Sequence, residues 1–180
     1  MTLPAMLDIA SVLVFALTGA LVASRAQLDI VGFVFVAALT AVGGGTLRDL
    51  LLDRPVFWVE RPLFVLIAAG AAVVVFFTAH LVESRYRLLV WLDACALAVA
   101  VPAGVAVALG LDESWSVTLI MGILTGCLGG LLRDVVCNEM PLALQGGEPY
   151  VTCAFAGAGA ALVALQTGSG TGTALVLCGA

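Results

Sequence analysis

Long apolar runs, each followed by a short polar or Pro/Gly-rich segment, make up most of the chain. The runs are continuous rather than alternating, which favours membrane-spanning helices over the strands of a β-barrel. The pattern predicts six helices of this kind. Their expected ranges are 5–24, 29–52, 62–82, 88–110, 115–137 and 149–167.

A last apolar run begins near residue 170 and reaches Ala180, a length of about eleven residues. At about 1.5 Å of rise per residue, it is too short to cross a hydrocarbon core about 30 Å thick. We therefore expect a seventh helix that is truncated. The predicted fold class is an all-α polytopic membrane protein with seven transmembrane helices, forming a single transmembrane domain over residues 1–180.

The composition agrees with this pattern and excludes an ordinary soluble domain. Hydrophobic residues make up 63% of the chain, charged residues make up 11%, and the mean hydropathy is +1.20. Soluble domains are about half apolar and about a quarter charged. Because the N-terminus has no basic region and no cleavage site, residues 6–24 are expected to be the first spanning helix rather than a removed signal peptide.

The charged and reactive residues exclude several function classes. The chain contains twelve acidic residues, seven arginines and no lysine, so we expect no basic surface for binding nucleic acid. The five cysteines lack CxxC spacing, and we interpret them as small apolar packing residues. Neither a Ser/His/Asp set, nor a P-loop, nor a metal-ligand cluster is present in the sequence. We therefore expect no enzyme activity, no cofactor and no tightly bound metal.

The arginines suggest an orientation in the membrane. With the N-terminus outside, the inner loops carry Arg25, Arg85 and Arg87, whereas the outer loops carry Arg54 and Arg61. Since inner loops hold the excess of positive charge in most membrane proteins, we expect the N-terminus to lie outside.

An internal repeat is the most informative feature of the sequence. A shift of 85 residues places GGTLRD at 44–49 on GGLLRD at 129–134, and the same shift pairs Asp8 with Asp93. Matching Arg-Asp pairs behind matching diglycines at one fixed offset indicate a duplication rather than chance likeness between apolar segments.

The duplication predicts an inverted topology. Repeat one covers about 5–82, repeat two covers about 88–167, and the final helix begins at about 170. Each repeat holds three crossings, an odd number, so the second repeat must enter the membrane from the opposite side. Such 3+3 inverted repeats are typical of proteins that carry solutes through a pathway between the two halves.

The glycine clusters predict kinks in the second and fifth helices. They comprise Gly43, Gly44 and Gly45 in the first repeat, and Gly129 and Gly130 in the second. Glycine weakens a helix, and broken helices at membrane depth are tolerated only where protein or water satisfies the freed backbone groups. The alternative is that the glycines only allow close packing of helices.

Charged residues follow both glycine clusters: Arg48 with Asp49, and Arg133 with Asp134. A charge at the centre of the bilayer costs about 2.5–3.5 kcal/mol, so these groups should face the protein interior and be paired. The direction of the helices predicts one ion pair within each repeat, Asp8–Arg48 and Asp93–Arg133. The alternative is that these pairs only hold helices together and have no role in transport.

Hydroxyl groups near the glycines are further candidates for an ion pathway. Thr46 follows the first cluster directly, and Thr40 and Thr125 occupy equivalent positions in the two repeats. Their hydroxyls could contact an ion, or they could donate to the backbone of their own helix.

The segments DIASVLVFALTGALVASR, GGGTLRDLLLDRPVFWV and GGLLRD resemble the trimeric intracellular cation (TRIC) channel family, in its bacterial and archaeal branch, over residues 8–166. The resemblance implies a homotrimer of seven-helix subunits, each with a potassium-permeable pore shaped by the kinked second and fifth helices. It places the pore at Gly43, Gly44, Gly45, Arg48, Asp49, Gly129, Gly130, Arg133 and Asp134. Leu128 stands where the first repeat has glycine, so the second kink is expected to be milder.

The resulting hypothesis is a potassium or other monovalent cation channel in a prokaryotic inner membrane, surrounded by lipid. Backbone carbonyls at the glycine breaks, helped by Asp49 and Asp134, are the expected ion ligands. A secondary transporter of a small neutral solute such as glycine is the alternative, because inverted repeats suit alternating access equally well. A membrane scaffold without transport is a third interpretation.

Overall fold

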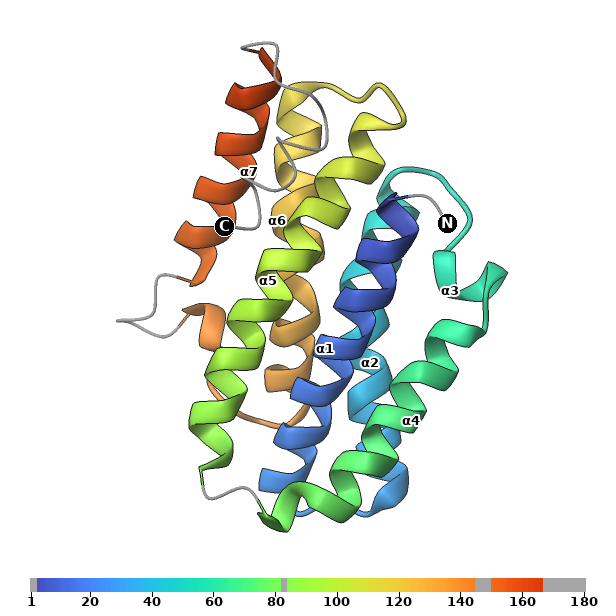
Figure 1. The fold of residues 1–180 in the computed structure, drawn as a ribbon, viewed down its shortest axis with the longest axis vertical. Coiled ribbons are helices and arrows are strands. Elements are labelled where there is room, and N and C mark those ends of the chain that lie inside the picture. Colours follow the sequence, from blue (N-terminus) through green and yellow to red (C-terminus); the bar gives the residue numbers. More distant parts are fainter. Residues whose placement is uncertain (1–2, 82–83, 145–149, 167–180) are drawn as a thin grey trace.

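The computed structural model describes residues 3–81, 84–144 and 150–166, and the described chain is entirely helical apart from turns and loops (Figure 1). Two short 3-10 helices, η1 and η2, accompany the α-helices. The elements in chain order are α1 (Leu3–Arg25), α2 (Ile30–Leu51), α3 (Phe57–Glu60), α4 (Leu63–Thr78), η1 (Ala79–Leu81), α5 (Arg85–Leu109), α6 (Trp115–Val136), η2 (Leu142–Leu144) and α7 (Tyr150–Gln166).

The all-helical membrane class is confirmed. Five described helices are long and apolar enough to cross a membrane, so the chain is an integral membrane protein. The sixth predicted span corresponds to α7, which has 17 described residues. The seventh predicted helix, from about residue 170, lies outside the described residues. The sequence did not predict α3 or η2, which follow α2 and α6.

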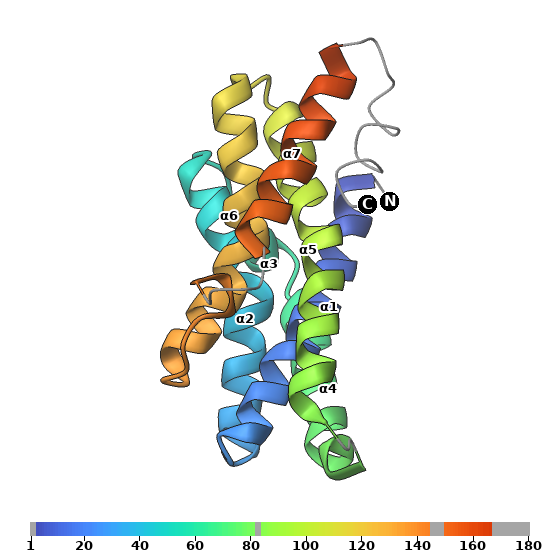
Figure 2. The same cartoon turned by 90° about the vertical axis from the view of Figure 1, so that its left-hand side faces the viewer.

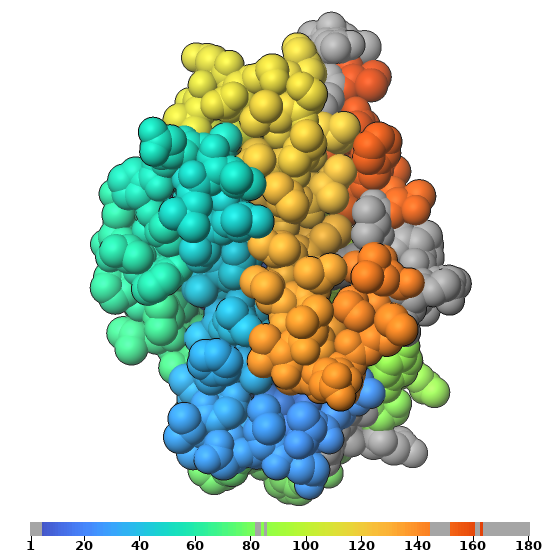
Figure 3. Space-filling model, turned by 180° about the vertical axis from the view of Figure 1, so that it is seen from behind, coloured from blue at the N-terminus to red at the C-terminus, as the bar shows by residue number. Residues whose placement is uncertain are grey.

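Equivalent helices of the two repeats run in opposite directions. In Figure 1, α1 runs downward from the N-terminus, whereas α5, its equivalent, runs upward beside it. Figure 2 shows the same pairing from the side, and Figure 3 shows α2 and α6 next to each other on the opposite face. These four helices form the centre, with α4 against α1 and α2, and α7 against α5 and α6. The inverted arrangement follows from these directions.

The 85-residue offset also relates the turns that end the helices. The non-glycine residues with positive φ fall into two equivalent pairs in the described chain: Gln27 (54°) with Asp112 (56°), and Asp53 (49°) with Asn138 (55°). Each pair occupies the turn after the same helix of its repeat. The duplication therefore extends from the sequence motif to the backbone conformation of the loops.

Neither helix is interrupted at its glycines, so a kink there is a bend within a continuous helix rather than a break. The backbone of α2 remains α-helical through Gly43–Gly45, and that of α6 remains α-helical through Gly129 and Gly130. A continuous helix keeps its carbonyl groups in the i to i−4 hydrogen bonds, so they are not available as ion ligands. The expected role of these backbone carbonyls as ion ligands stays a prediction, and it requires the helical turn at the glycines to open.

The glycines instead allow α2 and α6 to approach each other closely, which was the alternative interpretation. A Cβ atom added at Gly129 would lie 2.5 Å from the carbonyl oxygen of Thr40. The equivalent contact, between Gly44 and the carbonyl oxygen of Thr125, is at least as close. The two contacts are reciprocal across the repeats, so only glycine fits at either position without moving a helix backbone.

Candidate functional site

Arg133 lies at the centre of a fully paired cluster in repeat two. Its side chain is 0% exposed, and its Nε donates to Oδ1 of the neighbouring Asp134 at 2.7 Å. Nη1 and Nη2 donate to the two carboxylate oxygens of Asp93 on α5, at 2.7 and 2.8 Å. Two parallel bonds of this kind are the strongest arrangement for an arginine and a carboxylate. The predicted Asp93–Arg133 pair is confirmed.

Arg48 lies in the equivalent cluster of repeat one, which is less complete. Nε donates to Oδ1 of Asp49 and Nη1 donates to Oδ1 of Asp8, both at 2.9 Å, so the predicted Asp8–Arg48 pair is also confirmed. Nη2 is buried and has no hydrogen-bond partner among the described residues. The Phe57 ring lies near the guanidinium, with Cζ of Arg48 5.6 Å from the ring centroid.

Asp49 and Asp134 fasten the segment that follows each helix. One oxygen of each carboxylate accepts from the adjacent arginine. The other oxygen accepts a backbone N–H at 2.9 Å, from Phe57 in repeat one and from Leu142 in repeat two. Both oxygens of each carboxylate are thus bonded to protein, and these residues hold α3 and η2 in place in this conformation rather than presenting a free oxygen to an ion.

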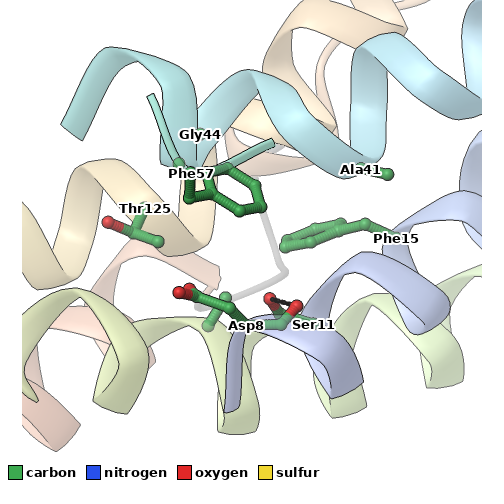
Figure 4. Close-up of a pocket in the computed structure, with 9 residues that line it drawn as sticks. Asp8, Ser11, Phe15, Ala41, Gly44, Phe57 and Thr125 are labelled. Carbon is green, nitrogen blue, oxygen red and sulfur yellow. Dashed lines mark hydrogen bonds between the residues drawn. The ribbon is translucent and has the colours of Figure 1, made fainter. Parts of the chain in front are cut away.

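A small cavity lies beside the repeat-one cluster (Figure 4). Its volume is about 10 Å³, which is room for about one water molecule. Asp8 and Ser11 line it from α1, Thr125 lines it from α6, and the rings of Phe15 and Phe57 border it. The cavity therefore combines a carboxylate, two hydroxyls and two aromatic rings where the two repeats meet.

The predicted glycines differ in their relation to this cavity. Gly44 and Gly45 line it, and a Cβ at Gly45 would lie 2.6 Å from Cε1 of Phe57. Gly43 instead faces the side chain of Leu132 on α6. Gly129 packs against α2, and Gly130 is buried in α6.

The threonine hydroxyls bond to their own helices, one of the two alternatives left open by the sequence. Thr40, Thr46 and Thr125 each donate to the carbonyl oxygen four residues earlier, at 2.6 Å. The Thr46 hydroxyl also accepts from Nε1 of Trp58 at 2.8 Å, which ties α3 to α2.

Sequence reasoning missed Ser11, Phe15 and Phe57 as cavity residues. Ser11 and Phe15 lie among apolar positions of α1, within a segment that carries the family resemblance but does not indicate a role for either residue. A signal for Phe57 was available, because the 85-residue offset relates it to Leu142 and both directly follow the turn after an Arg-Asp helix.

Comparison with known proteins places this site in a family. A protein-family model described as Glycine transporter matches residues 5–80 and 90–166. A UPF0126 membrane protein of Vibrio cholerae serotype O1 is 38% identical over 178 residues, covering 95% of this chain and 72% of the relative. The UPF0126 inner membrane protein YadS of Escherichia coli (strain K12) is 39% identical, covering 84% of this chain and 73% of the relative.

Solved structures give the same result. The TRIC trimeric intracellular cation channel orthologue from Rhodobacter sphaeroides matches with a TM-score of 0.95 and 44% identity, over 99% of this chain and 92% of that chain. A prokaryotic TRIC channel in 0.5 M KCl matches with a TM-score of 0.88 over 98% of this chain and 91% of that chain; at 23% identity, this second match supports the fold alone. The chain belongs to the prokaryotic TRIC channel family, whose matching family model is described as Glycine transporter.

Proposed function

We propose that this protein is a monovalent cation channel, with potassium as the permeant ion and a pathway inside each subunit. The observation that carries the proposal is the carboxylate of Asp8 in a water-sized cavity where the two repeats meet. We further propose a homotrimer in a prokaryotic inner membrane with the N-terminus outside. The 44% identity to the Rhodobacter sphaeroides protein, a trimeric intracellular cation channel orthologue, supports both proposals.

The charge of the two buried clusters favours cations over anions. Each arginine bonds two carboxylates: Arg48 with Asp8 and Asp49, and Arg133 with Asp93 and Asp134. With all groups ionised, the repeat-two cluster carries one net negative charge, whereas in repeat one Arg54, whose Nε lies 3.6 Å from Oδ1 of Asp49, offsets that charge. An isolated arginine beside the pathway would repel a potassium ion, whereas the carboxylates paired with Arg48 and Arg133 remove that repulsion. The exposed acids Asp112 and Glu113 on the proposed outer side add to this attraction.

The conformation described here is a closed one for this pathway. The cavity beside Asp8 admits about one water, so a hydrated cation needs a rearrangement of its walls to pass. Conduction requires sites that hold an ion weakly enough to release it. Asp8 fits this requirement, because its carboxylate accepts only one hydrogen bond from Arg48 and its side chain is 13% exposed.

Single-channel recording of the purified protein in planar bilayers tests the proposal. A cation channel gives unitary current steps. In a potassium chloride gradient across the bilayer, the reversal potential should shift from zero toward the equilibrium potential of potassium rather than that of chloride. Bi-ionic recording with potassium and sodium then measures the preference between the two. Absence of unitary steps from protein that is folded and inserted would contradict the channel proposal.

A secondary transporter of glycine is the second candidate, favoured by the description of the matching family model. Inverted repeats are also the usual architecture of such carriers. Proteoliposomes loaded with buffer and supplied with labelled glycine distinguish the two functions. Saturable glycine uptake without unitary current supports the carrier, whereas unitary current without glycine uptake supports the channel.

A further inference from the structure

The two repeats differ at the residue that begins the short helix after the Arg-Asp turn. Phe57 begins α3 in repeat one, and Leu142 begins η2 in repeat two. Both donate their backbone N–H to the equivalent aspartate, so their backbones are held in the same way. Their side chains differ in surroundings: the Phe57 ring borders the cavity, whereas Leu142 packs in a small apolar cluster with Val22 and Leu89.

The Phe57 ring occupies a position between the cavity and the repeat-one arginine. It rests on the bare backbone of Gly45, and its edge packs against Phe64 of α4 with centroids 4.8 Å apart. The guanidinium of Arg48 lies near the ring, where a cation–π contact takes the place of the second hydrogen bond that Arg133 donates to Asp93. The ring therefore contacts both the charged cluster and the wall of the cavity.

The element that carries Phe57 has few attachments. The α3 helix has four residues between Pro55 and Pro62, and the side chain of Val59 on it is 61% exposed. Hydrogen bonds fix it at two points, the Phe57 N–H to Asp49 and the Trp58 indole to Thr46. A short segment with few buried contacts moves at lower cost than the long helices around it.

We propose that Phe57 is the residue that closes the ion pathway, and that the pathway opens in repeat one by displacement of its ring from the cavity while repeat two stays fixed. An apolar ring beside a water-sized space excludes water and ions until it moves. The fully bonded Arg133 cluster gives repeat two no comparable loose contact. This inference rests on the proposed channel function where it is tested by recording current. A test that measures the access of a water-soluble reagent to the cavity does not depend on the channel function.

The accessibility experiment uses a reporter thiol in the cavity. Ser11→Cys is introduced into a variant whose five native cysteines are replaced by alanine, and a charged, water-soluble thiol reagent is added to the protein in liposomes. Phe57→Ala should raise the labelling rate of the reporter about tenfold, as expected for a shift in population toward the open state. Phe57→Leu, which keeps a buried apolar side chain, should give a smaller rise.

Leu142→Ala is the matched control, because it removes a buried side chain from the equivalent place away from the cavity. Its labelling rate should stay within about twofold of the parent, although its thermal stability falls. In bilayers, Phe57→Ala should raise open probability and Leu142→Ala should not.

The inference is overturned if Phe57→Ala labels at the parent rate, or if Leu142→Ala raises the rate as much as Phe57→Ala does. Thermal unfolding of each variant identifies one that has lost its fold, and Phe57→Leu then provides the comparison. If the parent protein and Phe57→Ala conduct no current but Phe57→Ala still exposes the reporter, the channel proposal fails, whereas the control of access to the cavity by Phe57 stands.

Discussion

Arg133 and Asp93 form a two-pronged ion pair between α6 and α5, with nitrogen–oxygen distances of 2.7 and 2.8 Å. The equivalent arginine in repeat one donates a single bond to Asp8. The side chain of Asp93 is 2% exposed and that of Asp8 is 13% exposed. The duplicated motif has therefore kept one cluster as a closed structural element and left the other next to a polar cavity.

Replacing Asp93 with asparagine should destabilise the protein strongly. The substitution leaves Arg133 buried without its two-pronged partner, and removing one member of a buried ion pair costs about 3–5 kcal/mol. Asp8→Asn should cost less, because it removes one hydrogen bond from a carboxylate that is partly exposed. In thermal unfolding in detergent, the parent should have the highest melting temperature, Asp8→Asn a lower one and Asp93→Asn the lowest.

Asp53→Asn is the control for these substitutions. Asp53 is exposed and has φ of 49°, and the equivalent position in repeat two is already asparagine, Asn138. The control should melt within a degree or two of the parent, since exposed substitutions change stability by about 0.5 kcal/mol or less. Equal melting temperatures for Asp8→Asn and Asp93→Asn would contradict the difference between the two clusters.

The glycine contacts between α2 and α6 give a second prediction. Gly44→Ala and Gly129→Ala each place a methyl group against a backbone carbonyl of the opposite helix, which cannot move without separating the helices. Overpacking of this kind costs about 1–3 kcal/mol, measured as a lower melting temperature. Because the two contacts are reciprocal, the two variants should lose similar amounts of stability.

Gly70→Ala separates this effect from helix propensity. Gly70 lies on α4, where an added Cβ meets no atom within 4 Å. Alanine favours a helix over glycine by about 1 kcal/mol, so this variant should be as stable as the parent or more stable. If Gly44→Ala were also neutral, close packing would not be the reason for glycine at that position.

The sequence predicted the spanning helices well because the polarity and turn propensity of the residues at their ends determine where each helix stops. Apolar runs bounded by charged or turn residues fix the ends of α2, expected at 29–52 and found at Ile30–Leu51. The ion pairs were predictable for a related reason: a buried charge requires a partner, and besides the adjacent aspartate each repeat offers one carboxylate on a neighbouring spanning helix, Asp8 or Asp93. Two independent copies of the same arrangement made the choice of Asp8 and Asp93 possible.

The sequence left the role of the glycines open and gave no information on the cavity. A run such as Gly43–Gly45 weakens a helix and also permits close packing, and only the position of α6 decides between these effects. The cavity depends on side chains brought together from α1, α2, α3, α5 and α6. No periodicity in a single helix encodes that meeting, and a backbone N–H such as that of Phe57 carries no signal in its residue type.

The bond between Trp58 and Thr46 gives a third prediction. Trp58→Phe removes the indole donor and should cost about 1 kcal/mol, because the Thr46 hydroxyl keeps its bond to the helix backbone. Thr46→Val should cost somewhat more, since it leaves the partly buried indole N–H without its acceptor. In the double variant the two losses of stability should not add. Thermal or denaturant unfolding of the parent, the two single variants and the double variant measures the coupling energy between the residues. A coupling energy of zero would show that the bond does not stabilise α3.

Asp8→Asn should change the ionic selectivity of the proposed channel. The substitution removes a negative charge from the cavity and makes the repeat-one cluster more positive by one unit, so cations lose an attractive site and anions lose a repulsive one. In a potassium chloride gradient the reversal potential should move toward zero relative to the parent.

The matched control is Glu113→Gln, which removes an exposed acid near the mouth of the proposed pathway. Its effect on the reversal potential should be smaller and should disappear at high salt, because exposed charges are screened within about 10 Å at 0.1 M. A buried charge is screened much less, so the shift caused by Asp8→Asn should persist at high salt. An unchanged reversal potential in folded, conducting Asp8→Asn would mean that the ions pass elsewhere.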